Sequence, residues 1–167
     1  MIVAEDIYYP SRYRHLEVTT LYKKILVATD GSEQAKNALE HAAISAQKWG
    51  ALLTILSVVP PPTPMILGDV QFGRDFSLDL EKTFTAYHLG VLDEAKKTLK
   101  SKYPSVSVTT QLKKGTVALK IVEASEDEDL DLIIIGSRGL SGLSCLLLGS
   151  ISNYVVNHCK KPVLVVK

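Results

Sequence analysis

The chain has few cysteines and no excess of either charge. Cys145 and Cys159 are the only two cysteines in 167 residues, too few for a disulfide framework and without metal-ligand spacing. The net charge is +1, from 19 basic and 18 acidic residues, which argues against a nucleic-acid or acidic membrane partner. These features favour a protein of a reducing compartment.

Long apolar runs are also missing. No run approaches the ~20 residues that a membrane-spanning helix requires. The N-terminus carries Glu5 and Asp6 and lacks the apolar segment of a secretory signal. We therefore expect a cytoplasmic protein, and its apolar share of 46% and charged share of 22% are ordinary for one globular domain.

Several common functional motifs are absent as well. The sequence has neither a P-loop Gly-Lys-Ser/Thr at the required spacing nor the Gly-x-Gly-x-x-Gly of dinucleotide-binding folds. Its histidines (His15, His41, His88 and His158) are scattered, and neither a triad nor paired catalytic carboxylates can be built from local sequence. We therefore expect no efficient catalysis.

From residue 23 onward, β-branched runs alternate with helical patterns, which predicts an α/β fold with a parallel sheet. We predict strands at 24–29, 52–59, 106–112, 132–135 and 163–166. We predict helices after the Asp30-Gly31-Ser32 turn to Trp49, over 77–102, from 116 to about 125, and over 150–158. Residues 60–75 are interpreted as a long proline-rich loop, and residues 1–22 as an N-terminal extension to a domain at 23–167.

A glycine-rich segment follows the most apolar predicted strand. Gly136, Gly139, Gly142 and Gly149 lie where ligands bind in open parallel sheets, beyond the carboxyl end of a strand. Glycines let backbone amides converge on an anion, and Ser150 begins a helix whose first N–H groups are unpaired. This pattern predicts a polyphosphate site, with simple turns and an N-cap at Ser150 as the alternative.

The spacing Gly136-x2-Gly139-x9-Gly149-Ser150 resembles the G-2x-G-9x-G-S/T motif of the ATP-binding branch of the universal stress protein family. Residues 24–32 and 162–166 are similar to the family's opening and closing strands. The resemblance covers residues 23–167. It implies a single Rossmann-like (adenine nucleotide alpha hydrolase-like) domain with helices on both faces of a five-stranded parallel sheet in order 3-2-1-4-5.

The resemblance also implies a nucleotide-dependent regulatory protein of the stress response that binds ATP, ADP or AMP with Mg²⁺ or Mn²⁺. It implies a homodimer formed through Val163–Val166. By position, Ala28, Thr29 and Asp30 would line the adenosine end, and Leu53 would meet adenine through its backbone. The remaining expected contacts, toward ribose and phosphates, are Gly136, Ser137, Arg138, Gly139, Gly149, Ser150 and Ile151.

Asp30 has two interpretations. A carboxylate ~4 Å from a phosphate would be repelled by about 4 kcal/mol at an effective dielectric of 20, so a place beside phosphates requires a divalent cation. Alternatively, Asp30 and Glu33 form a variant of the helix capping box. Two other functions stay open: a slow ATPase or phosphotransfer enzyme, and a nucleotide-free dimeric module of the same fold. A dinucleotide or flavin binder is disfavoured.

Overall fold

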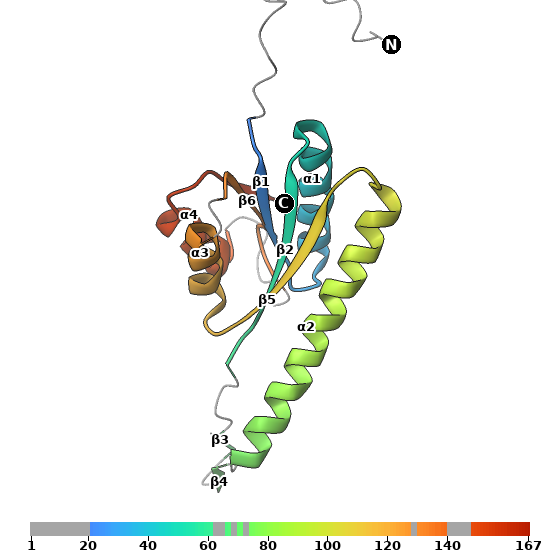
Figure 1. The fold of residues 1–167 in the computed structure, drawn as a ribbon. Helices are drawn as coiled ribbons and strands as arrows, with labels where there is room; N and C mark the ends of the chain where they lie inside the picture. The colour runs from blue at the N-terminus through green and yellow to red at the C-terminus, as the bar shows by residue number, and fades with distance from the viewer. Residues whose placement is uncertain (1–20, 62–65, 68–69, 72–73, 128–129, 140–147) are drawn as a thin grey trace, which may run out of the picture.

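The computed structural model describes residues 21–61, 66–67, 70–71, 74–127, 130–139 and 148–167. One sheet of five parallel strands forms the centre of the molecule (Figure 1). Its strands, in spatial order, are β5 (Val108–Lys114), β2 (Leu52–Val59), β1 (Lys24–Ala28), β6 (Leu132–Gly136) and β7 (Val163–Val166). The α/β class and the order 3-2-1-4-5 are confirmed.

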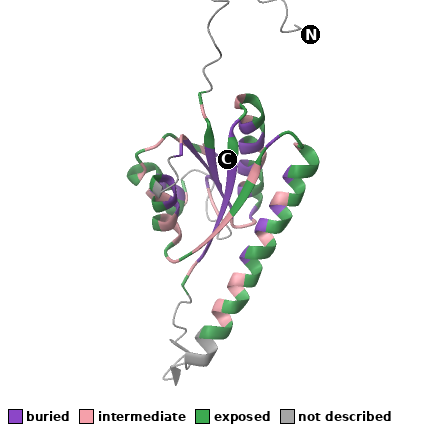
Figure 2. Ribbon diagram, in the orientation of Figure 1, coloured by how far each residue is buried: buried purple, intermediate pink, exposed green. Residues whose placement is uncertain are grey.

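Four helices cover the sheet on both faces. They are α1 (Glu33–Trp49), α2 (Arg74–Lys102), α3 (Val117–Asp127) and α4 (Ser150–His158). Figure 1 shows α1 and α2 on one side of the sheet and α3 and α4 on the other. The central strands are buried on both faces, and every residue of β6 is buried, as its sequence predicts (Figure 2).

The two faces hold two separate apolar cores. Ile25, Val27 and Leu53 pack with α1 and α2, whereas Leu26 and Leu56 pack with α3 and α4. Successive side chains of a strand point to opposite faces, so the predominantly apolar strands β1 and β2 supply both cores at once.

Helix α1 begins two residues later than a cap at Asp30 requires. Ser32 is the N-cap, and its Oγ accepts a hydrogen bond from the backbone N–H of Ala35 at 3.3 Å. Asp30 Oδ1 instead accepts from the backbone N–H of Ser32 at 3.0 Å. The predicted capping box of Asp30 and Glu33 is therefore wrong, because Asp30 belongs to the turn that precedes the cap.

The predicted loop at 60–75 also holds regular structure. Two short strands, β3 (Ile66–Leu67) and β4 (Val70–Gln71), pair antiparallel, and α2 begins at Arg74 rather than 77. Strand β5 is shifted to Val108–Lys114 because its pairing with β2 extends to Lys114 opposite Val59. Lysines in an edge strand can keep their charges in water. A prediction that follows the apolar pattern therefore ends before the lysines, although the strand continues.

None of the helices in the described part of the chain is long and apolar enough to cross a membrane. Gly142 and Cys145 lie outside the described residues, as do residues 1–20 of the predicted N-terminal extension.

Candidate functional site

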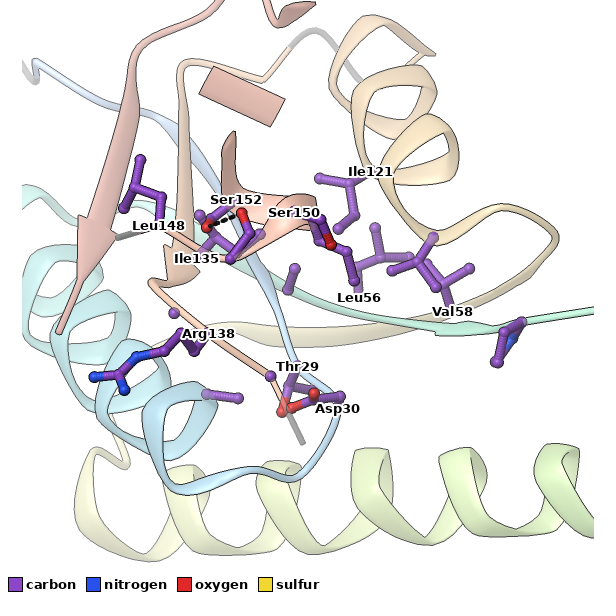
Figure 3. A pocket seen from close by; sticks show the side chains of 18 of the residues that line it. Thr29, Asp30, Leu56, Val58, Ile121, Ile135, Arg138, Leu148, Ser150 and Ser152 are labelled. Carbon is purple, nitrogen blue, oxygen red and sulfur yellow. Dashed lines mark hydrogen bonds between the residues drawn. The ribbon is translucent and has the colours of Figure 1, made fainter. Parts of the chain in front are cut away.

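A cavity of about 580 Å³ opens at the carboxyl edge of the sheet, where β1 and β6 lie side by side (Figure 3). This is the switch point of the sheet, because the chain leaves β1 and β6 in opposite directions. Nine of the eleven predicted site residues line the cavity: Ala28, Thr29, Asp30, Gly136, Arg138, Gly139, Gly149, Ser150 and Ile151. The fold thus brings together three segments that are far apart in the sequence.

Leu53 is not one of them. It lies near the amino end of β2, is fully buried in the α1/α2 core, and its backbone N–H donates to the Ser107 carbonyl at 2.9 Å. The expected adenine contact at Leu53 does not fit this position. The cavity is at the carboxyl end of the strands, where β2 contributes Leu56 and Val58 instead.

Ser137 also lies outside the cavity lining, and it holds two elements together. Its carbonyl accepts hydrogen bonds from Gly149 N and Ser152 Oγ, both at 2.8 Å, and its own N–H donates to the Val166 carbonyl at 2.6 Å. Its Oγ is buried and has no hydrogen-bond partner among the described residues. Ser137 therefore fixes the end of β6 against the start of α4.

Two glycines are required by close approach rather than by an unusual φ. A Cβ at Gly136 would lie 3.0 Å from the backbone of Gln34, at the start of α1. A Cβ at Gly139 would lie 2.5 Å from Oδ2 of Asp30. A side chain at position 139 would therefore occupy the space that separates the glycine-rich segment from the Asp30 carboxylate.

The turn after β1 is tied down from several sides. Ser57 Oγ donates to the Thr29 carbonyl at 2.8 Å, and Tyr87 Oη donates to the Asp30 carbonyl at 3.1 Å. His88 Nδ1 lies 2.8 Å from Ser57 Oγ. Helix α2 thus fixes the turn after β1, directly through Tyr87 and indirectly through the contact of His88 with Ser57.

The start of α4 has no side-chain cap among the described residues. Gly149 is its N-cap, and no side chain of the described residues caps it. The first intrahelical hydrogen bond runs from Asn153 N to the Gly149 carbonyl at 2.9 Å. The amides of Ser150, Ile151 and Ser152 belong to residues that line the cavity and have no intrahelical acceptor, and the helix dipole makes this end attractive to an anion.

Charged and apolar groups occupy different parts of the cavity. Asp30 is the acidic residue and Arg138 the basic residue in the lining, and in Figure 3 the Arg138 side chain extends away from Asp30. The apolar wall comes from β2, α3 and β6, through Leu56, Val58, Val117, Ile121 and Ile135. A planar apolar group fits this wall, and an anion fits the start of α4.

Sequence reasoning missed His88, which also lines the cavity. Burial lowers the pKa of His88, and the nearby Asp30 carboxylate opposes that shift. The side chain therefore favours its neutral form. A single histidine inside a helix carries no sequence signal of this kind, because α2 reaches the cavity only after folding.

The sheet order and a crevice at the switch point define a doubly wound α/β protein with a cavity at its carboxyl edge. The Universal stress protein family model matches residues 21–167. The chain belongs to the universal stress protein family.

Sequence and structure comparisons agree. The chain is 32% identical over 150 residues to universal stress protein YxiE of Bacillus subtilis, covering 88% of this chain and 100% of that one. It is 31% identical over 160 residues to universal stress protein MJ0577 of Methanocaldococcus jannaschii, covering 90% and 98%. The solved MJ0577 structure superimposes with a TM-score of 0.64, at 30% identity and 88% and 96% coverage.

A universal stress protein solved in complex with cAMP shares the fold. Its TM-score is 0.62 at 24% identity, with 87% of this chain and 96% of that chain covered.

Proposed function

We propose that the protein binds an adenine nucleotide, with ATP as its main ligand, and acts as a nucleotide-dependent regulatory protein in the stress response. The observation that carries this proposal is the uncapped start of α4 beside Gly139, at one end of a cavity with an apolar wall. A ligand with a polyanionic end and a planar end matches that arrangement. The cAMP complex of a protein with the same fold supports the ligand class.

In the orientation we propose, the phosphates lie beside Gly149 and bind the amides of Ser150 and Ile151, and the base lies against Leu56 and Val58. The ribose then lies near Asp30. The residues fit the nucleotide because the start of α4 has no side-chain cap and Leu56 and Val58 form part of an apolar wall. This replaces the expected adenine contact at Leu53 with the later part of β2.

Mg²⁺ or Mn²⁺ is the cation that the site would need. Asp30 is the only carboxylate among the described lining residues, and a phosphate close to it would be repelled without a cation between them. The described residues contain no cluster of three metal-ligating side chains, so the phosphates would supply the other ligands. A bound cation would neutralise phosphate charge, and the residues of this chain would only orient that cation.

Thermal unfolding with and without Mg-ATP tests the proposal. At 100 times its Kd, a ligand adds about 2.7 kcal/mol to the stability of the folded state, so we expect a clear rise in Tm. The matched control is Gly139→Val, whose side chain meets the Asp30 carboxylate and blocks the site. An unchanged Tm of the parent protein in saturating Mg-ATP would reject nucleotide binding and leave the nucleotide-free module.

We also propose a homodimer through β7. This strand is at the edge of the sheet, is apolar along its whole length, and leaves Leu164 40% exposed. An exposed apolar edge favours pairing with a second copy across a two-fold axis. Val165→Pro removes a backbone donor from the edge, and we expect light scattering to show a folded monomer. A folded dimer of unchanged mass would place the interface elsewhere.

A further inference from the structure

The hydrogen bonds around Ser57 fix the protonation of the His88 ring. The Ser57 hydroxyl has one proton, and it donates that proton to the Thr29 carbonyl at 2.8 Å. In the 2.8 Å contact between Ser57 Oγ and His88 Nδ1, the nitrogen must therefore be the donor. A neutral His88 with its proton on Nδ1 has an unprotonated Nε2, which can only accept a hydrogen bond.

The second ring nitrogen is available to a ligand. Nε2 has no hydrogen-bond partner among the described residues, yet the side chain is only 8% exposed and His88 lines the cavity. Because His88 lines the cavity, a hydrogen-bond donor of a molecule that fills the cavity can satisfy Nε2. The side chain also cannot turn freely, because Nδ1 is held by Ser57 and the ring packs edge-on against Tyr87 at 5.3 Å between centroids.

An acceptor-only nitrogen selects one end of a nucleotide. Phosphate oxygens carry no proton at neutral pH and cannot satisfy Nε2, whereas ribose hydroxyls and the amino group of adenine are donors. His88 lies close enough to Asp30 for the carboxylate to affect its ionisation. His88 Nε2 and the Asp30 carboxylate are therefore hydrogen-bond acceptors in the same part of the cavity. The start of α4, in contrast, supplies hydrogen-bond donors.

We propose that His88 is a specificity-determining residue of this site, whose Nε2 accepts a hydrogen bond from an O–H or N–H of the nucleoside half of the ligand. This inference rests on the proposed nucleotide binding and adds to it. It assigns α2 a direct part in recognition, with Ser57 as the positioning residue that holds the His88 ring.

Two substitutions at position 88 separate the roles of the ring nitrogens. The amide of Asn lies where Nδ1 was and can still donate to Ser57, whereas the amide of Gln reaches the position of Nε2 and can present an oxygen there. By calorimetry with Mg-ATP, we expect His88→Asn to raise Kd about 10-fold, equivalent to about 1.4 kcal/mol. We expect His88→Gln to stay within about 3-fold of the parent protein, the range of one weak hydrogen bond.

Inorganic tripolyphosphate is the internal control. It offers no donor to Nε2, so the parent protein and both variants should bind it equally. Three ATP analogues then identify the donor: 2′-deoxy-ATP, 3′-deoxy-ATP and ITP, which lacks the 6-amino group. The analogue without the relevant donor should bind the parent protein and His88→Asn with the same Kd, whereas the other two should retain the difference.

The inference is overturned if Mg-ATP binds the parent protein and a folded His88→Asn equally, or if Asn and Gln weaken binding to the same extent. Ser57→Ala covers the case of unfolded position-88 variants. It keeps the His88 ring but removes the Ser57 hydrogen bonds to His88 Nδ1 and to the Thr29 carbonyl, and we expect Kd to rise at least about 3-fold. Unchanged binding in Ser57→Ala would also count against it. Failure of the parent protein to bind Mg-ATP at all would instead refute the proposed function itself.

Discussion

Two helices begin at the edge of the same cavity, and their first turns differ. The start of α1 is closed, because Ser32 caps it and Asp30 accepts from the Ser32 amide. The start of α4 is open, because its N-cap is Gly149 and no side chain of the described residues takes its place. A side-chain cap uses one of the first N–H groups of a helix, whereas an uncapped start keeps that group for a ligand. The comparison favours the start of α4 for the proposed anion site, although both helices begin at the cavity.

The backbone supports the same distinction. The Thr29–Asp30 carbonyls are held by Ser57 and Tyr87, so this side of the cavity is built from satisfied groups and a fixed carboxylate. On the other side, the Ser137 carbonyl accepts from Gly149 and leaves the next amides of α4 without an intrahelical acceptor. In the proposed binding mode, one side of the cavity therefore positions groups and the other binds charge.

The largest effect is expected from placing a charged capping side chain at the start of α4. Gly149→Asp would place an acceptor and a negative charge at the N-cap of α4. At ~4 Å from a phosphate and an effective dielectric of 20, that charge costs about 4 kcal/mol, a loss of roughly 1,000-fold in Mg-ATP affinity. Calorimetry gives the Kd directly.

The matched control is Gly149→Asn, which has the same shape and also caps the helix but carries no charge. Both side chains meet the same tight contact, since a Cβ at position 149 would lie 3.2 Å from the Ser137 carbonyl. We expect Asn to lose at most about 10-fold in affinity, the value of one or two neutral hydrogen bonds. Equal Kd values for Asp and Asn would contradict an anion site at this helix.

A smaller effect, on stability rather than on affinity, is expected from removing the cap of α1. Ser32→Ala removes the cap of α1 and should lower the free energy of unfolding by about 1 kcal/mol, as N-cap substitutions do. Because the α1 amides are not the ones that hold phosphate, the Kd for Mg-ATP should change less than about 2-fold. Urea unfolding measures the first quantity and calorimetry the second. A tenfold rise in Kd here would mean that α1 also binds the anion.

The smallest effect is expected from pH. Burial lowers the pKa of His88 in the folded protein below its ordinary value of 6.5, so between these two values the unfolded chain binds more protons. The contribution of neutral His88 is thus complete above about pH 6.5 and is lost as the pH falls through the folded-state pKa. Urea unfolding between pH 5 and 8 should show this slope, and His88→Gln should flatten it. An identical slope in the variant would assign it to other groups.

Much of the site followed from local sequence. Glycines after an apolar strand, and a helix starting at Ser150, predicted the anion-binding side without any contact information, because backbone amides are specified by chain conformation alone. The strand-to-helix alternation similarly predicted the α/β class. The errors arose where side chains compete for the same backbone groups: the cap passed from Asp30 to Ser32, two residues on, a choice that depends on how the turn after β1 closes.

Contacts between distant segments could not be read in this way. The expected contact at Leu53 came by position from the family resemblance, and the mostly apolar sequence of β2 does not reveal which of its ends faces the cavity. The contribution of α2 was equally hidden, since Tyr87 and His88 look like ordinary helix residues until the helix packs beside β2.

By itself, the sequence determined the alternation of strands and helices, the apolar strands of the centre, and the glycines that leave amides free, because each depends on residues close together along the chain. Only the tertiary structure decided which helix start stays uncapped toward the cavity and which side chains face it from α2 and β2. Those features depend on residues that are dozens of positions apart, such as Ser57 and His88, meeting through packing.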